Sequence, residues 1–279
     1  MPDSFVLLDA DDPQSPVVLS VPHAGRDYPP ALHATLRAPA ASLRTLEDRH
    51  VDAIALAARS NEALLIQHRP RAWIDLNRGE HERDPLIDDG ARGSPLSAKV
   101  RAGLGLIPRR TAAAGDLWSR RLAGGEVEER IAADHRPYHE ALAALLERTR
   151  ARFGVAVLLD VHSMPPIAGS AARVVIGDRF GRAAAHRFVR RLEAATRAHG
   201  IAYAINTPYA GGHILERHAD PRGGVHGIQL EIDRSLYLDR ALDAPGTGMP
   251  SVVQLVRAMI DALADEAFAG RPPAALAAE

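Results

Sequence analysis

The sequence predicts a three-layer α/β domain with helices on both sides of a central sheet. Short apolar runs alternate along the chain with longer stretches of helical periodicity, which is the order expected when helices connect the strands of one sheet. The chain has 279 residues and no internal repeat or low-complexity linker, so we expect one domain over 1–279. Its share of hydrophobic residues, 46%, is ordinary for a globular protein and does not suggest disorder.

The first half of the chain predicts three strands, one helix and a long irregular segment. The valine-rich run at 16–21 reads as a buried strand that ends at Pro-His-Ala-Gly. Apolar positions recur with helical spacing over 46–60. Two further apolar runs, at 63–67 and 72–76, predict strands. Residues 79–125 are polar and contain several glycines, so we expect a long excursion or lid with short helices.

The second half alternates strands and helices more regularly. Short apolar runs predict strands at 155–161, 173–177, 201–205 and 225–232. Amphipathic periodicity predicts helices at 127–153, 180–198 and 250–267. The first of these helices should break near Pro137, and the second should stop at Gly200. Residues 270–279 read as a flexible tail.

Composition excludes several classes of function. Without cysteine the chain cannot form disulfides, use a thiolate nucleophile or bind zinc through sulfur. A net charge of -1 gives no reason to expect a nucleic-acid partner or an anionic membrane surface. The first residues lack the layout of a signal peptide and no apolar run is long enough to span a bilayer, so we expect a cytoplasmic protein. Composition neither predicts nor excludes a homo-oligomer.

Two histidines at expected strand ends predict a metal site. His23 lies in Ser-Val-Pro-His-Ala-Gly, and His162 lies in Leu-Leu-Asp-Val-His-Ser. Two imidazoles and one carboxylate bind a catalytic zinc ion and leave one coordination position for water. Asp160 shares a strand face with His162, so it could orient that imidazole. Either histidine taken alone is more often a structural, hydrogen-bonded residue.

The carboxylate ligand cannot be chosen from spacing. The segment Glu47-Asp48-Arg49-His50 opens an expected helix, where carboxylates also favour the positive end of the helix dipole. Positions two apart do not share a helix face, so Asp48 and His50 could bind one ion only from a loop. Glu47, Asp48 and His50 remain candidates.

Other charged residues predict a base and an anion-binding site. Glu231 interrupts an apolar strand, which is costly unless the carboxylate is paired or functional. Burial would raise its pKa and suit a general base, although a structural ion pair explains it equally well. Asn77 and Arg78 follow an expected strand, and Arg217 and His218 follow a Gly-Gly turn, so both pairs could hold a substrate carboxylate. The alternative interpretation is that these arginines have no ligand and are simply exposed to solvent.

These residues resemble the N-formylglutamate amidohydrolase (N-formylglutamate deformylase) family over residues 17–239. The resemblance rests on the joint order of blocks that are each weak alone. They are Ser-Val-Pro-His23-Ala-Gly, Asp48-Arg-His50-Val, Asp75-Leu-Asn77-Arg78, Pro137-Tyr138-His139, Asp160-Val-His162-Ser163-Met, Gly211-Gly212-His213 through Arg217-His218, Gly224-Val-His226-Gly-Ile-Gln-Leu-Glu231-Ile, and Leu236-Tyr237-Leu238.

The family is similar to zinc carboxypeptidases and aspartoacylases, which implies a mixed, mostly parallel sheet between helices and one Zn²⁺ per chain. By this resemblance His23 and His162 are ligands and Glu231 is the general base. The wider superfamily has His-x-x-Glu at its first ligand site, whereas the third residue after His23 is Arg26. The carboxylate ligand must therefore come from elsewhere, and the resemblance implies Asp48, because it lies in the family-like block Asp48-Arg-His50-Val.

The resemblance also implies roles for residues around the metal. Asp160 and His50 are expected behind the ligands. The residues expected to bind substrate are Asn77, Arg78, His139, Arg217 and His218.

The implied reaction cleaves the formyl amide of N-formyl-L-glutamate, a small dicarboxylate, to formate and L-glutamate. Two cations, Arg78 and Arg217, could bind its two carboxylates. The alternatives are a related zinc deacylase or carboxypeptidase-like hydrolase with another substrate, and a non-catalytic protein that binds a metal or a small acid. Binding alone does not need a base, so Glu231 favours the enzyme.

Overall fold

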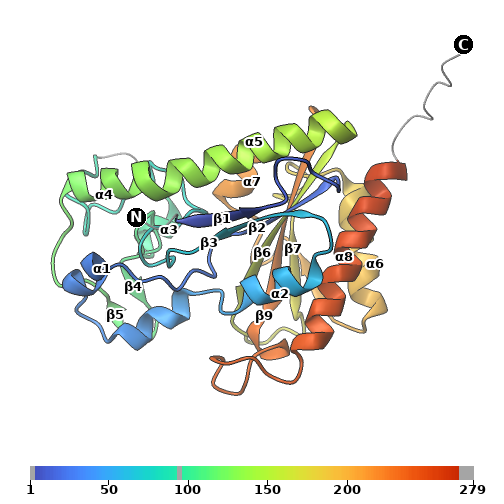
Figure 1. The fold of residues 1–279 in the computed structure, drawn as a ribbon. Coiled ribbons are helices and arrows are strands. Elements are labelled where there is room, and N and C mark those ends of the chain that lie inside the picture. The colour runs from blue at the N-terminus through green and yellow to red at the C-terminus, as the bar shows by residue number, and fades with distance from the viewer. Residues whose placement is uncertain (1–3, 93–95, 270–279) are drawn as a thin grey trace, which may run out of the picture.

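A computed structural model, which describes residues 4–92 and 96–269, contains a mixed seven-stranded sheet between layers of helices (Figure 1). The strands lie in the order β1-β3-β2-β6-β9-β7-β8. Their bounds are β1 Phe5–Leu8, β2 Val17–Val21, β3 Ala63–Gln67, β6 Ala156–Met164, β7 Val174–Gly177, β8 Tyr203–Ile205 and β9 Val225–Asp233. Strands β3, β2, β6 and β9 run parallel, whereas the pairs β1–β3 and β7–β9 are antiparallel. The predicted mixed, mostly parallel sheet is confirmed.

Helices cover both faces of this sheet. The helices are α1 Pro30–Thr35, α2 Val51–Ala58, α3 Ala98–Arg101, α4 Gly124–Arg130, α5 Arg136–Phe153, α6 His186–Ala198, α7 His213–His218 and α8 Met249–Ala269. Helices α2, α6 and α8 contribute to the core on one face, and α5 and α7 contribute to the core on the other (Figure 1). Along the described chain, no helix combines the length and the apolar character that crossing a bilayer requires.

The central strands are buried on both faces, as inner parallel strands usually are. In β6, Val157, Leu159 and Val161 join the core beneath α2 and α8, whereas Leu158 joins the core beneath α5. Because side chains alternate along a strand, Asp160 and His162 face the α5 side. The same alternation places Ser20 of β2 and Gln229 and Glu231 of β9 on that side. One face of the sheet therefore collects buried polar side chains towards the carboxyl ends of the parallel strands.

Several predicted elements end or begin at different residues in the structure. Residues 72–76 are not a strand, because both edges of β3 are already paired, with β1 and β2. The helix predicted over 46–60 begins only at Val51, because His50 has a left-handed backbone with φ of 60°. Likewise, left-handed conformations at Arg179 and Phe180 delay the next helix to His186.

The helix predicted over 127–153 does not break at Pro137. Helix α4 passes through the π-helical turn Ile131–His135 directly into α5. Pro137 comes directly after this π-helical turn, so the expected break takes the form of a local change in helical pitch. Strand β6 also extends beyond the predicted end, so His162 lies inside the strand. The sequence patterns missed β1, α1 and α7, and the tail predicted at 270–279 lies outside the described residues.

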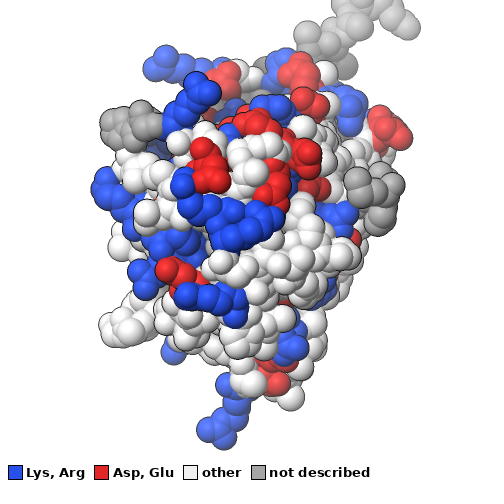
Figure 2. Space-filling model, turned by 90° about the vertical axis from the view of Figure 1, so that its left-hand side faces the viewer, with Lys and Arg blue, Asp and Glu red and all other residues white. Residues whose placement is uncertain are grey.

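The described part of the excursion, 79–92 and 96–125, is irregular, as predicted, and contains α3 and the short hairpin β4 Arg110–Thr111 and β5 Gly115–Asp116. Ion pairs stabilise it: Arg83 pairs with Asp88, and Arg109 Nε donates to Asp84 Oδ2 at 2.9 Å. On the side of the molecule that Figure 2 faces, positive and negative side chains lie next to one another. Whether the excursion moves as a lid stays a prediction.

Gly25 holds the end of β2 against the loop that follows β3. A Cβ atom at this position would lie 2.2 Å from the Arg69 carbonyl oxygen and 2.5 Å from that of His68. Because both are backbone atoms, we expect Gly25→Ala to lower the free energy of unfolding by about 1–3 kcal/mol in urea denaturation. Gly125→Ala is the control, since a Cβ there meets nothing within 4 Å. Equal stability of the two variants would contradict the prediction.

Candidate metal centre and active site

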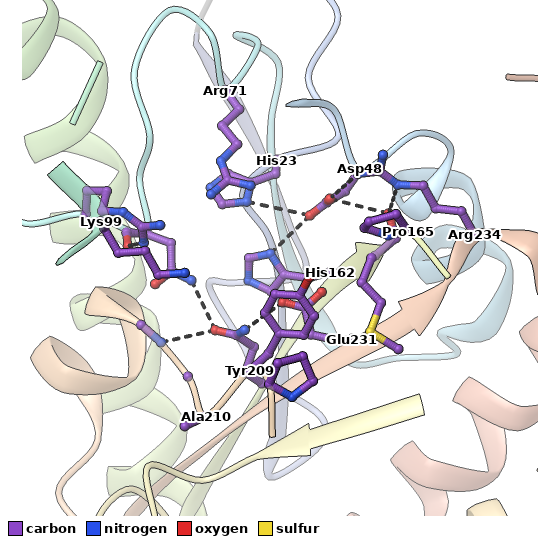
Figure 3. Close-up of a pocket in the computed structure, with 18 of the residues that line it drawn as sticks. His23, Asp48, Arg71, Lys99, His162, Pro165, Tyr209, Ala210, Glu231 and Arg234 are labelled. Atoms are coloured by element: carbon purple, nitrogen blue, oxygen red, sulfur yellow. Dashed lines mark hydrogen bonds and ion pairs between the residues drawn. The ribbon is translucent and has the colours of Figure 1, made fainter. Parts of the chain in front are cut away.

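His23, Asp48 and His162 come together at the carboxyl ends of β2 and β6 (Figure 3). One ligand atom from each of the three lies within 4.8 Å of the others. Asp48 Oδ2 is 3.1 Å from His162 Nδ1 and 3.6 Å from His23 Nδ1. All three side chains are buried. Asp48 reaches the two imidazoles from the turn that precedes α2, where its backbone N–H donates to the His23 carbonyl oxygen at 2.9 Å.

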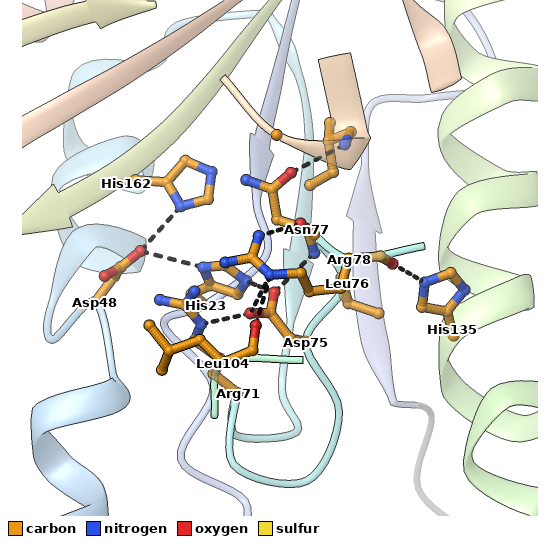
Figure 4. A network of polar contacts seen from close by, with 12 residues as sticks. His23, Asp48, Arg71, Asp75, Leu76, Asn77, Arg78, Leu104, His135 and His162 are labelled. Carbon is orange, nitrogen blue, oxygen red and sulfur yellow. Dashed lines mark hydrogen bonds and ion pairs between the residues drawn. The ribbon is translucent and has the colours of Figure 1, made fainter. Parts of the chain in front are cut away.

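Each imidazole is oriented by a carboxylate on its far side. His162 Nε2 donates to Asp160 Oδ2 at 2.8 Å, which agrees with the role predicted for Asp160. His23 Nε2 donates to Asp75 Oδ1 at 2.8 Å, a partner that the sequence patterns did not identify (Figure 4). With both Nε2 atoms engaged, the two Nδ1 atoms face Asp48. Carboxylates behind metal-binding histidines commonly fix ring orientation in this way.

The donor set fits a divalent metal ion. The buried His23 Nδ1 has no hydrogen-bond partner, which is costly unless the atom serves another purpose. Burial alone would raise the pKa of Asp48, but hydrogen bonds and charges from His162 and His23 hold the pKa of this carboxyl well below its usual value. Two imidazole nitrogens and an ionised carboxylate match the ligands of a catalytic zinc site with an open position.

Arg234 and Ser163 hold Asp48 from behind. Arg234 Nη2 donates to Asp48 Oδ1 at 3.2 Å, and Ser163 Oγ donates to the same oxygen at 3.3 Å. Arg234 also donates from Nε to Ser163 Oγ at 3.0 Å. These contacts leave Oδ2 of Asp48 directed at the imidazoles. Arg234 follows β9 and was not singled out from the sequence, because nothing local distinguishes it from a solvated arginine.

Glu231 lies beside this group on the adjacent strand. Its position on β9 is directly opposite His162 on β6 in the parallel register. Burial, together with the negative charge of Asp48, raises the pKa of Glu231 to about 7. Gln229 Nε2 donates to Glu231 Oε1 at 2.8 Å and fixes the carboxyl group. A carboxyl with this pKa can both accept and donate a proton near neutral pH.

These side chains line a cavity of about 360 Å³ that is rich in cationic groups (Figure 3). Its walls include Arg71, Arg78, Lys99 and Arg234. Arg71 and Arg78 come from the loop after β3, and Lys99 comes from α3 in the excursion. Polar neutral groups from Tyr209 and the Ala210-Gly211-Gly212 segment complete the opposite wall. The cavity can therefore accept a small anionic molecule next to the candidate metal group and Glu231.

Asn77 and Arg78 line this cavity, as predicted, but their polar groups are largely engaged (Figure 4). Asn77 Nδ2 donates to Gln229 Oε1 at 3.0 Å, and its Oδ1 accepts from the Ile214 N–H at 2.9 Å. Arg78 Nε donates to the Leu104 carbonyl at 2.8 Å. Asn77 thus fixes Gln229, the residue that holds Glu231.

Three residues predicted to bind substrate do not line the cavity. His139 is fully buried on α5, where its Nε2 donates to the Leu76 carbonyl at 3.0 Å. His218 and Arg217 lie on α7, which packs against α5 and directs them into a separate surface hollow with Arg150. The structure therefore does not bring these three residues to the cavity, and their predicted role in substrate binding stays a prediction.

The alternatives to Asp48 as the third ligand, Glu47 and His50, are also placed elsewhere. Glu47 accepts hydrogen bonds from Tyr28 and from Arg49. The left-handed backbone of His50 turns its ring away, and His50 Nε2 donates to the Asp243 carbonyl at 3.1 Å. His50 consequently does not support the metal group as predicted. Asp48 is the member of this segment that meets both imidazoles.

Known proteins are similar to this chain over most of its length. Residues 15–238 match the family model described as N-formylglutamate amidohydrolase. The chain is 29% identical over 264 residues to the N-formylglutamate deformylase of Pseudomonas aeruginosa, covering 91% of this chain and 93% of the relative. It is 30% identical over 233 residues to that of Pseudomonas putida, covering 80% and 82%.

A solved structure is similar over nearly the whole chain. The crystal structure of an N-formylglutamate amidohydrolase from Ralstonia eutropha has a TM-score of 0.87 and 31% sequence identity, covering 96% of this chain and 99% of that one. The structure of a gene product from Agrobacterium tumefaciens shares the fold, with a TM-score of 0.69 at 17% identity, over 95% and 96% of the two chains. The chain belongs to the N-formylglutamate amidohydrolase family.

Proposed function

We propose that this protein hydrolyses N-formyl-L-glutamate to formate and L-glutamate with the help of one bound zinc ion. The observation that carries the proposal is the meeting of His23, Asp48 and His162 with the buried Glu231 in one cationic cavity. The relatives named above as deformylases and amidohydrolases of N-formylglutamate support the choice of substrate. The cavity volume of about 360 Å³ suits a small ligand.

In this proposal His23 Nδ1, Asp48 Oδ2 and His162 Nδ1 hold the ion. When bound there, zinc would supply a Lewis acid that acidifies a water molecule and polarises the formyl carbonyl. Asp75 and Asp160 keep both Nε2 atoms protonated, so that each Nδ1 lone pair is available.

Glu231 is the proposed general base and then the general acid. Its carboxylate takes a proton from the attacking water, whose oxygen forms a bond to the formyl carbon. The protonated carboxyl then gives this proton to the amide nitrogen as the C–N bond breaks, and formate and the free amine leave. Its pKa of about 7 suits both transfers, and the hydrogen bond from Gln229 keeps the group in place.

The cations of the cavity are proposed to bind the two substrate carboxylates. Because Arg217 lies outside the cavity, Arg71, Arg78 and Lys99 replace the predicted pair of Arg78 and Arg217. Arg71 donates from Nε to Asp75 Oδ2 at 2.9 Å. Arginine groups held in this way present a rigid fork to a carboxylate.

Lys99 offers a clean test of substrate binding, since it is the only lysine of the sequence and lines the cavity. We expect Lys99→Met to raise KM about tenfold or more, because it removes a charged hydrogen-bond donor from the substrate site. Metal content should not change, because Lys99 is not one of the three proposed ligands. Steady-state formate release at varied substrate concentration measures the effect.

Arg101→Met is the matched control, since Arg101 is an exposed cation on the same helix. N-formyl-L-glutamate should also protect Lys99 from amine-reactive reagents, which have only the α-amino group as a second target. Reduced hydration of the ammonium group in the cavity, together with the charges of Arg78 and Arg71, lowers the pKa of Lys99 and should make the free amine more reactive. An unchanged KM with full labelling in the presence of substrate would exclude Lys99 from the binding site.

Formate release from N-formyl-L-glutamate, measured with and without a chelator, tests the proposed function as a whole. We expect chelation to abolish turnover and zinc to restore it. One equivalent of zinc bound without formate release would direct attention to other N-acyl amino acids. Full activity in the presence of chelator, with no metal bound, would refute the mechanism.

A further inference from the structure

A second cluster of histidines lies behind the loop that carries Asn77 and Arg78. His135 ends the π-helical turn, His139 follows one turn later on α5, and His213 begins α7. One ring nitrogen from each of these three lies within 4.8 Å of the others. Their ring centroids are 4.4 to 5.9 Å apart. The proposed catalytic mechanism uses none of them.

The hydrogen bonds identify which nitrogen atoms are available in this cluster. His135 Nε2 is 2.8 Å from the Arg78 carbonyl oxygen, and His139 Nε2 is 3.0 Å from that of Leu76. A carbonyl oxygen only accepts, so both Nε2 atoms carry the proton and both Nδ1 atoms of the neutral rings have a lone pair. His135 Nδ1 and His213 Nε2 are buried and have no hydrogen-bond partner in the described structure.

Two unpartnered, buried imidazole nitrogens beside a third imidazole are costly for a cluster that only fills space. We propose that His135 Nδ1, His139 Nδ1 and His213 Nε2 bind a second divalent cation of the zinc type. Imidazole nitrogens suit zinc, copper, cobalt and nickel, and they disfavour magnesium and calcium. The site shares no residue with His23, Asp48 and His162, so it does not depend on the proposed function.

We infer that Glu80, which lies next to His135 but outside the group of three close ligand atoms, moves in to supply the fourth ligand. Its Oε1 atom lies 3.9 Å from His135 Nδ1, and the carboxylate is held by two hydrogen bonds from Arg136. Three imidazoles and one carboxylate complete a tetrahedral site without an open position, which is typical of a structural ion. His135 ends a π-helical turn, and such turns often mark functional sites.

His218 competes with the cation for one ligand atom. Because His139 Nε2–H is used by Leu76, the 2.8 Å contact between His139 Nδ1 and His218 Nε2 requires His218 to be the donor. A cation at His139 Nδ1 would replace this hydrogen bond. Removing the donor should therefore strengthen metal binding, an effect that a cluster with a packing role alone would not show.

An ion at this site would stabilise the loop that carries Asn77 and Arg78. His135 and His139 donate to the carbonyls on either side of Asn77, and His213 is followed by Ile214, whose N–H donates to the Asn77 side chain. Ligation would tie α5 and α7 to the one segment that positions Asn77, and through it Gln229 and Glu231. We infer a structural role, with a secondary effect on the geometry of the base.

Metal stoichiometry of the purified full-length protein tests the site. After equilibration with zinc and removal of the excess, we expect about two equivalents in the wild type, one in His135→Gln/His213→Gln and one in His23→Gln/His162→Gln. Cobalt substitution of His23→Gln/His162→Gln should give the visible absorption of a tetrahedral imidazole-rich site. One equivalent in the wild type and none in His23→Gln/His162→Gln would overturn the proposal.

The variant His218→Phe keeps the stacked ring and removes the competing donor. In the background of His23→Gln/His162→Gln, it should tighten zinc binding about 2- to 10-fold, the value of one hydrogen bond. Unchanged or weaker binding would contradict the assignment of His139 Nδ1 as a ligand. If His135→Gln/His213→Gln does not fold, the cobalt spectrum and the His218→Phe comparison still decide the question.

Discussion

Replacing Glu231 with Gln is expected to lower kcat for formate release by about 10²- to 10⁴-fold, the usual contribution of a positioned acid–base group. Gln keeps the shape of the side chain and can still contact Gln229, but it cannot accept the proton of the attacking water. Metal content should stay at the wild-type value, because Glu231 is not among the proposed ligands. Formate release and metal analysis on the same preparation separate the two effects.

Glu147→Gln is the matched control, since Glu147 is an exposed carboxylate on α5. The wild-type pH profile gives a further check. Because the Glu231 pKa is raised to about 7 without a cation, and a bound cation lowers it, kcat/KM should fall as the pH drops through a value at or below about 7. The residual activity of Glu231→Gln should lack this limb. Wild-type turnover in the variant would eliminate Glu231 as the base.

Asp48→Asn is expected to weaken zinc binding at the proposed site by more than about 100-fold. Removing a residue that only hydrogen-bonds to a metal ligand typically weakens binding by roughly 10- to 100-fold, and Asp48 is a proposed ligand itself. The variant removes the one negative charge between two imidazoles and leaves the Arg234 guanidinium without its buried counter-ion. Activity should fall in parallel and should recover in part at high zinc concentration. Competition with a zinc chelator measures the affinity.

Glu47→Gln separates the role of Asp48 from a general effect of lost charge in the same turn. Glu47 is equally buried but faces Tyr28 and Arg49, so its loss should reduce stability without changing zinc affinity. The result that would contradict our assignment is the reverse order, with zinc affinity lost in Glu47→Gln and retained in Asp48→Asn.

The layers and the central strands could be predicted from the sequence because their signals are local. A continuous apolar run such as 155–159 has few alternatives to a buried strand. The errors came from non-local causes. Residues 72–76 have the composition of a strand, yet β3 had no free edge for them. The late start of α2 depends on the left-handed His50, a position that residue type does not announce.

The residues of the candidate site likewise divide into those with a local sequence signal and those placed by non-local contacts. His23, His162 and Glu231 stood out because each is a polar residue in or beside an apolar run. Asp75 was noticed in its motif, but its contact with His23 joins residues 52 positions apart and could not be read from spacing. Arg234 was missed for the same reason. Arg217 and His218 were misplaced because the turn of α7 towards α5 depends on packing between helices.

The register between β6 and β9 determines whether Glu231 lies beside His162. His162 and Glu231 are opposite each other in the parallel ladder and point to the same face of the sheet. If β9 were displaced by a single residue, Glu231 would turn into the apolar core beneath α8 and Leu230 or Ile232 would take its place. The content of regular secondary structure would hardly change, whereas the proposed base would be absent from the site. The turnover recovered after refolding therefore measures the fraction of molecules with the correct β6–β9 register. Circular dichroism does not detect this register.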